Sequence, residues 1–92
     1  MPIELGDRIR DFVVERWIGA DADTNSYAAS HPKQPEGRFI IKVLPATATR
    51  ERKDAFLREG VAMIKADGAI RPLDVGEMAN GDIYMLFVDL SQ

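Results

Sequence analysis

The sequence predicts an α+β domain in which a five-stranded antiparallel sheet carries one helix between its third and fourth strands. Residues 39–44 form an apolar run broken only by Lys42, residues 49–65 follow a helical hydrophobic period, and Asn80-Gly81 separates two strand-like segments. Every connection between neighbouring strands is short, as antiparallel pairing allows. The 92 residues suffice for one small domain, which we expect to span residues 1–92.

The first two strands lie in the N-terminal third of the chain. Residues 12–18 are rich in β-branched and aromatic side chains and end at Gly19, which predicts a strand followed by a turn. Residues 26–30 predict a second, weaker strand. The segment 31–37 contains two prolines and a glycine, so it predicts a loop before the third strand.

The third strand and the helix come next. A continuous apolar run is typical of a strand covered on both faces, and Lys42 inside it needs a partner. The helix is expected to begin after Thr49, whose hydroxyl can cap it, and to end near Gly68. Gly60 inside the helix costs about 1 kcal/mol relative to alanine, so we expect a neighbour to pack closely against it. Residues 73–77 and 82–88 then complete the sheet as a hairpin.

Composition excludes several classes of function. The chain is 46% hydrophobic and 29% charged, which is typical of a folded domain. Its net charge of −3 provides no basic field for nucleic acid, and with no cysteine and one histidine we expect no metal site. No apolar segment is long enough to span a membrane, so we expect a cytoplasmic protein without membrane contact.

Taken together, these motifs resemble the N-terminal lobe (N-lobe) of eukaryotic-like serine/threonine protein kinases, especially the bacterial branch. In that family a glycine-rich hairpin joins the first two strands, and the matching residues 19–29 keep its first glycine, Gly19. The family's V-A-I-K strand is matched by residues 39–42, and its R-F-x-x-E helix by residues 55–59. The resemblance covers nearly the whole chain and implies the N-lobe fold.

The resemblance also assigns roles to single residues. It implies that Lys42 would contact nucleotide phosphates and that Glu59 would hold the lysine by an ion pair. It places Ile40 where an alanine touches the adenine ring, and Phe87 at the gatekeeper position before the hinge. With Gly19, these positions form a nucleotide-site-like set that we expect to be vestigial. We expect Lys42 and Glu59 to remain as a structural ion pair between helix and sheet.

The departures from the family pattern argue against nucleotide binding. The second and third glycines are replaced by Asp21 and Thr24, and Asp23 adds another carboxylate. A carboxylate in this loop would repel a phosphate that family members hold with backbone N–H groups. Ile40 fills the adenine slot, and Ser26 replaces the valine above it. We interpret the two aspartates as a solvated acidic turn; the alternative is that they contribute to a Mg²⁺ site.

The resemblance implies no catalytic residue in this chain, because the catalytic and magnesium-binding residues of kinases belong to the second lobe. No H-R-D or D-F-G motif occurs in the sequence. We therefore predict a stand-alone, degenerate N-lobe that acts as a non-catalytic protein-interaction or regulatory module without a cofactor. The alternative is one half of a split kinase or phosphotransferase that binds ATP and Mg²⁺ only with a separate C-terminal lobe (C-lobe). A third interpretation is a structural domain of an assembly.

The last strand predicts the surface on which such a module would act. Residues 83–88 are apolar on both faces, and one helix in so short a chain covers only one face well. We therefore expect a protein partner, or a second copy of the chain, to bind the side that a kinase gives to its hinge and C-lobe. The expected contact residues are Tyr84, Leu86 and Val88.

Overall fold

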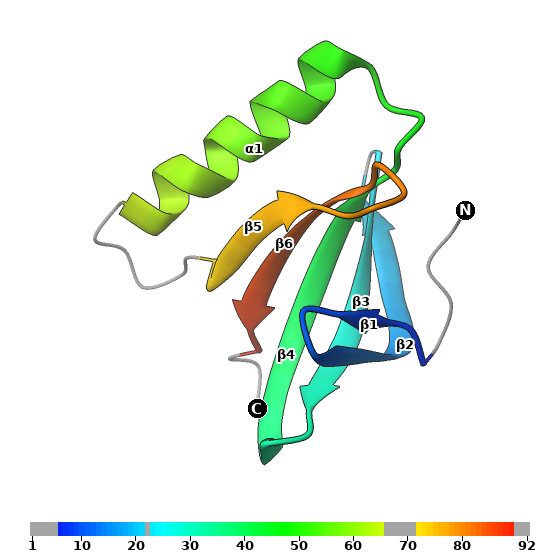
Figure 1. Cartoon of the computed structure of the whole chain (residues 1–92), viewed down its shortest axis with the longest axis vertical. Helices are drawn as coiled ribbons and strands as arrows, with labels where there is room; N and C mark the ends of the chain where they lie inside the picture. The colour runs from blue at the N-terminus through cyan, green and yellow to red at the C-terminus, as the bar shows by residue number, and fades with distance from the viewer. Residues whose placement is uncertain (1–5, 22, 66–71, 90–92) are drawn as a thin grey trace.

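A computed structural model describes residues 6–21, 23–65 and 72–89 of the chain. Six strands and one helix follow one another as β1 (Arg8–Ile9), β2 (Phe12–Asp21), β3 (Thr24–His31), β4 (Gln34–Leu44), α1 (Arg50–Lys65), β5 (Asp74–Glu77) and β6 (Ile83–Val88). The strands form one antiparallel sheet in the order β1-β2-β3-β4-β6-β5 (Figure 1). The α+β prediction is confirmed, with the helix between the third and fourth predicted strands.

The sheet has one strand more than the sequence predicted. Strand β1 pairs with β2 through a two-residue turn at Arg10 and Asp11, whose φ angles are 52° and 72°. Two consecutive positive φ angles are typical of a type I′ hairpin turn, which glycine and asparagine usually occupy. Because an Arg-Asp pair carries no such signal, the sequence did not reveal this short edge strand.

The predicted loop at residues 31–37 is largely strand. β3 continues to His31 and β4 begins at Gln34, so the connection is only two residues long. Pro35 is tolerated because β4 pairs with β6 only from Phe39 onward, which leaves this part of β4 without a neighbour on that side. The ring of His31 packs edge-on against Phe12 with 4.8 Å between centroids, so the histidine is half-buried rather than fully solvated.

Helix α1 begins where the sequence placed it. Thr49 is the N-cap: its hydroxyl oxygen accepts a hydrogen bond from the Arg52 N–H at 3.1 Å. Gly60 is buried, and a β-carbon there would lie 2.7 Å from Cγ2 of Val75, so the expected close neighbour is β5. Gly68, the predicted stop, lies outside the described residues. Within the described part of the chain, no helix combines the length and apolarity needed to cross a membrane.

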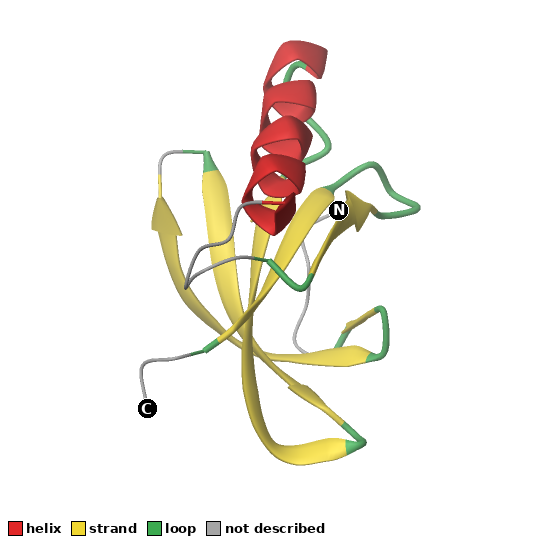
Figure 2. Cartoon of the chain, turned by 90° about the vertical axis from the view of Figure 1, so that its left-hand side faces the viewer, coloured by secondary structure: helices red, strands yellow, loops and turns green. Residues whose placement is uncertain are grey.

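Figure 2 shows a curled sheet with helix α1 on one side of it. Two hydrophobic cores lie on the two faces of this sheet. One core lies between the sheet and α1, and it contains Leu44, Phe56, Ile83 and Met85. The other core lies on the opposite face, and its buried residues are Ile9, Val14, Tyr27, Ala29, Phe39, Ile41, Val43, Tyr84 and Leu86. Because the sheet curls around this second core, both faces of β6 are covered within the chain from Ile83 to Leu86.

The hairpin between β5 and β6 is fixed to the start of the helix connection. Gly81 has a φ of 96°, as the predicted Asn80-Gly81 turn requires, and its N–H donates to the Met78 carbonyl at 2.9 Å. The buried Asp82 carboxylate accepts hydrogen bonds from the Ala46 N–H at 2.7 Å and from the Asn80 side-chain amide at 3.1 Å. This aspartate therefore joins the turn to the segment that follows β4.

Candidate functional site

Three of the nucleotide-site-like residues, Ile40, Lys42 and Phe87, lie on the helix-side face of the sheet, in two rows across β3, β4 and β6. Strand register places Ile40 opposite Phe87, and places Lys42 between Ser26 and Met85. Residues directly opposite in antiparallel strands share a face. Ile40 and Phe87 are both half-buried, and Phe87 packs against the core under α1. Strand register therefore brings Ile40 and Lys42 of β4 onto the same face as Phe87 of β6.

Lys42 and Glu59 do not form the expected ion pair. Lys42 is half-buried on β4, whereas Glu59 is exposed on α1. Three ion pairs are found among the described residues, and neither Lys42 nor Glu59 belongs to any of them. Glu59 can remain hydrated, so it loses little by leaving the lysine unpaired. The predicted structural ion pair between helix and sheet is therefore not formed in the described part of the chain.

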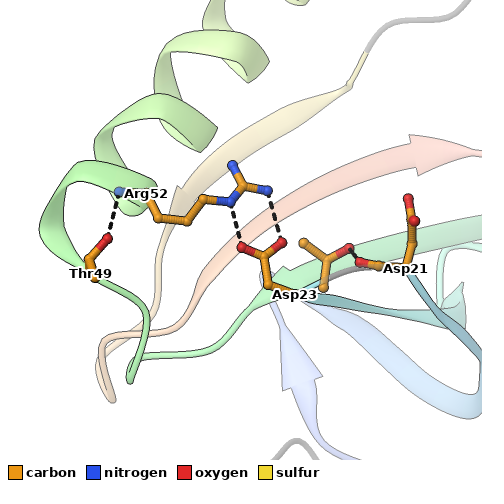
Figure 3. Close-up of polar contacts among 5 residues, drawn as sticks. Asp21, Asp23, Thr49 and Arg52 are labelled. Atoms are coloured by element: carbon orange, nitrogen blue, oxygen red, sulfur yellow. Dashed lines mark hydrogen bonds and ion pairs between the residues drawn. The ribbon is translucent and has the colours of Figure 1, made fainter.

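The carboxylate of Asp23 pairs with the helix instead. Nε and Nη2 of Arg52 donate to its two oxygens at 2.6 and 3.0 Å (Figure 3). The hydrogen bonds from Arg52 lower the pKa of Asp23, and the positive charges of Arg52 and Lys42 act in the same direction. Asp23 is solvent-exposed, as the interpretation of a solvated acidic turn expects, but its ion pair with Arg52 was not predicted. Asp21 forms no ion pair among the described residues.

The hairpin that corresponds to the glycine-rich loop is a paired ladder. Gly19 lies within β2 opposite Ser26, and a β-carbon at this glycine would meet no atom within 4 Å. Pairing continues through Asp21 and Thr24, where the threonine hydroxyl donates to the Asp21 carbonyl at 2.9 Å. Alternate backbone N–H groups of such a hairpin are taken up by ladder hydrogen bonds and are not available to a phosphate.

The expected contact surface on β6 needs correction. Tyr84 and Leu86 are 4% and 3% exposed, so neither can present its side chain to a partner. The reason is the curl of the sheet, which covers the face that one helix could not reach. Val88 is 44% exposed and Phe87 is half-buried. Leu73, 54% exposed, lies beside them, because its N–H donates to the Leu86 carbonyl at 2.6 Å.

Sequence reasoning missed the polar contacts between distant segments. Asp74 on β5 accepts a hydrogen bond from the Tyr84 hydroxyl at 2.8 Å and forms an ion pair with Nε of Arg10 at 3.0 Å. Asp23 and Arg52 meet across 29 positions of sequence. A hydrophobic period contains no information about such pairs, and no spacing in the sequence identifies them. Among the described residues, no group of three or more His, Cys, Asp or Glu side chains could hold a metal ion.

The order of the strands, the helix after β4 and the positions of Lys42 and Phe87 define the fold of a protein-kinase N-lobe. Neither the models of known protein families nor the sequences of curated proteins match this chain. Solved structures do match this chain. A cysteine-to-alanine mutant of the Mycobacterium tuberculosis PknI kinase domain superposes with a TM-score of 0.75 at 25% identity, covering 99% of this chain and 38% of that one.

Two further PknI structures agree with this result. A double mutant of the same kinase domain gives a TM-score of 0.73 at 26% identity over 95% of this chain and 35% of its own length. The kinase domain without a stated mutation gives 0.71 at 24% identity over 94% and 36%. The chain therefore spans less than two-fifths of the kinase domains it resembles, and it corresponds to their N-lobe.

Proposed function

We propose that this chain is a degenerate kinase N-lobe that acts as a non-catalytic protein-interaction or regulatory module and does not bind ATP by itself. The observation that carries the proposal is the arrangement of charges on the nucleotide face. Lys42 forms no ion pair with Glu59 among the described residues. The Asp23 carboxylate at the tip of the β2–β3 hairpin is close enough for the positive charge of Lys42 to contribute to lowering its pKa. A triphosphate approaching Lys42 would meet this carboxylate in place of a row of free N–H groups.

The adenine end of the face also argues against a nucleotide. Ile40 stands between Ala28 and Phe87 in the register of the sheet, and its side chain is half-buried. An isoleucine in this row takes up volume that the alanine of the family pattern leaves to the ring. Both halves of an ATP molecule therefore lack a suitable contact.

Thermal denaturation with and without millimolar Mg-ATP tests the proposal directly. We expect no change in melting temperature, because a ligand stabilises a fold only when its concentration exceeds its Kd. Mg²⁺ alone and Mg²⁺ with inorganic sulfate serve as controls for ionic strength. A rise of several degrees that is specific to ATP would contradict the proposal.

The surface for a protein contact is an apolar edge formed by Leu73, Phe87 and Val88, which we call the hinge edge. Leu73 and Val88 are 54% and 44% exposed at this end of the β5–β6 pair. Neighbouring residues of a strand point to opposite faces, so Val88 lies on the face opposite to Phe87. Exposed apolar side chains on both faces of this end support a contact with a protein partner or a second copy. Val88→Lys should weaken self-association or partner capture without lowering the melting temperature.

Light scattering after size-exclusion chromatography, followed by capture from a lysate of the native host, would measure both kinds of contact. Val61→Lys adds the same charge at a valine of equal exposure, 44%, on α1 and serves as the matched control. If Val88→Lys and Val61→Lys behave alike, the contact does not involve the hinge edge.

One observation favours the alternative of a split kinase. Lys42 and Glu59 still lie on β4 and α1, the elements that hold them in the kinase pattern, although no ion pair joins them. A C-lobe docked on the hinge edge could rotate the helix and bring them together. ATP binding that appears only when a C-lobe is added would favour this alternative over a non-catalytic module.

A further inference from the structure

The β2–β3 hairpin and helix α1 are joined by one bidentate ion pair at the tip of the hairpin. Both oxygens of Asp23 accept hydrogen bonds from the guanidinium of Arg52, at 2.6 and 3.0 Å, in a parallel geometry (Figure 3). Arginine forms this planar, two-point contact with carboxylates and with phosphates alike. The Asp23 carboxylate therefore occupies the position on Arg52 at which a phosphate could bind instead.

Arg52 is held by two contacts that do not involve Asp23. Its backbone N–H donates to the hydroxyl of the N-cap Thr49, and its guanidinium carbon lies 5.5 Å from the centroid of the Phe56 ring. Phe56 is only 3% exposed, so the ring provides a fixed surface for the cation. An arginine held in this way loses little side-chain entropy when it binds an anion.

Asp23 is also held on its own element. The neighbouring Thr24 is 4% exposed and donates its hydroxyl to the Asp21 carbonyl, which closes the tip of the hairpin. Asp21 is exposed and forms no ion pair among the described residues, whereas Asp23 reaches the helix. Two carboxylates two positions apart therefore have different surroundings.

The ion pair lies beside a space that could admit a ligand. A cavity of about 350 Å³ is lined by Asp23, Pro45, Thr47, Ala48, Thr49 and Arg52. The charged groups around the ion pair are Arg52 and Lys42, which attract the Asp23 carboxylate, and Glu59, which attracts Arg52 from the same helix. The cations would attract a phosphate if the carboxylate moved away.

We propose that Asp23 is a tethered anion that latches the β2–β3 hairpin onto α1 and competes with phosphate groups for Arg52. The latch gives a physical cause for the lack of ATP binding, so this inference rests on the proposed function and deepens it. A carboxylate attached to the same chain has a high effective concentration at Arg52, and a free phosphate must displace it. Opening the latch makes the cationic surface available.

Titration of the full chain with inorganic tripolyphosphate, monitored by two-dimensional NMR, tests whether Asp23 competes with phosphate groups. Asp23→Asn removes the charge and most of the pairing, and Asp21→Asn removes an equal charge from the same hairpin. We expect Asp23→Asn to bind tripolyphosphate roughly fivefold or more tightly than the unaltered chain, and Asp21→Asn to change binding by less than about twofold. Adding Arg52→Gln to Asp23→Asn should remove the gain.

Equal binding by the two single variants, or no gain in Asp23→Asn, would overturn the inference. Neither result would alter the conclusion on ATP binding by the unaltered chain, which is measured separately. If instead the unaltered chain bound ATP while Asp23→Asn still gained affinity for tripolyphosphate, the proposed function would fail and the latch would stand.

A second measurement reports on the latch without any ligand. Amide hydrogen exchange in residues 19–26 should accelerate in Asp23→Asn and in Arg52→Gln, but not in Asp21→Asn. The charge-reversed pair, Asp23→Arg combined with Arg52→Asp, should restore slow exchange that either reversal alone loses. Unchanged exchange in all variants would show that the ladder alone holds the hairpin and would overturn the latch.

Discussion

Nε of Arg10 lies 3.0 Å from Oδ2 of Asp74, and this ion pair joins the two outer strands of the sheet. Arg10 belongs to the turn after β1, whereas Asp74 begins β5. The same carboxylate oxygen accepts the hydroxyl of the buried Tyr84 at 2.8 Å. The contact therefore brings the ends of the curled sheet together above its second core.

This arrangement predicts a loss of stability at alkaline pH. Burial raises the pKa of Tyr84 to about 12, and the hydrogen bond donated to Asp74 adds to the shift. An unfolded tyrosine ionises near pH ~10, so the fold binds the phenolic proton more tightly than the unfolded chain does. The resulting stability is complete below pH ~10 and decreases between about pH 10 and about pH 12. Urea unfolding across this range measures it.

Tyr84→Phe provides the control, because it removes the ionisable group and keeps the ring. Its stability should fall less steeply over the same range. Some decrease should remain, since burial also raises the pKa of Tyr27. Parallel curves for the variant and the unaltered chain would contradict the assignment of the alkaline loss to Tyr84.

The elements that could be predicted from sequence are those specified by neighbouring residues. The apolar run of β4, the Thr49 cap and the Asn80-Gly81 turn are local signals, and each one matches the structure. The strand at Arg8–Ile9 and the start of β4 at Gln34 were not predictable, because a turn with unusual residues and a proline in a strand both contradict local preference. Tertiary pairing determined these segments.

The candidate site was less predictable than the fold. The resemblance to kinases assigned Ile40, Lys42 and Phe87 to positions of the family pattern, and in the structure strand register brings them onto one face. It could not indicate that Arg52 would take Asp23, because the choice between two charged partners depends on distances of a few ångströms. The burial of Tyr84 and Leu86 likewise depended on the curl of the whole sheet.

Gly60→Ala should destabilise the chain although it favours the helix. Alanine improves helix propensity by about 1 kcal/mol, but the added β-carbon would lie 2.7 Å from Val75 and 3.3 Å from Met85. Overpacking of this kind costs about 1–3 kcal/mol, so we expect a net loss of roughly 1 kcal/mol in the free energy of unfolding. Denaturant titration measures the difference.

The double variant Gly60→Ala with Val75→Ala distinguishes overpacking from other causes, because it removes the side chain that the new methyl group would meet. It should be more stable than the sum of the two single changes predicts. Arg58→Ala, an exposed change on the same helix, should alter stability by less than about 0.5 kcal/mol. Strict additivity of the two changes would rule out the contact as the cause.

Asp82→Ala should lower stability by about 1–3 kcal/mol, because it removes the buried acceptor of the part-buried Ala46 N–H. The carboxylate is 4% exposed and accepts hydrogen bonds from the Ala46 N–H and the Asn80 side-chain amide. Thermal and urea unfolding both report the loss. Asp54→Ala removes a carboxylate from a half-exposed ion pair on α1 and should cost far less. Similar losses in the two variants would argue against a special role for Asp82.

Arg52→Gln should raise the pKa of Asp23. In the structure the hydrogen bonds from Arg52 lower this pKa below that of the unfolded chain, which is about 3.9. The ionised carboxylate therefore stabilises the fold at pH values above about 3.9, and this stabilisation is lost as the pH falls through the lowered pKa. Carbon-detected NMR of the aspartate carboxyl groups follows the titration. Arg50→Gln is the matched control, since Arg50 pairs with Asp54 rather than with the hairpin. An unchanged pKa in Arg52→Gln would mean that the pair does not form in solution.

Lys42→Met should be nearly neutral for stability. Lys42 is half-buried without an ion pair among the described residues, and methionine keeps its apolar stem, so we expect a change of no more than about 1 kcal/mol. Glu59→Gln, at an exposed position, should also be small. A double-mutant cycle of the two changes should give a coupling energy below about 0.3 kcal/mol, because groups that do not interact contribute additively. Coupling above about 1 kcal/mol would show that lysine and glutamate pair in solution, and it would restore the nucleotide-competent arrangement that the split-kinase alternative requires.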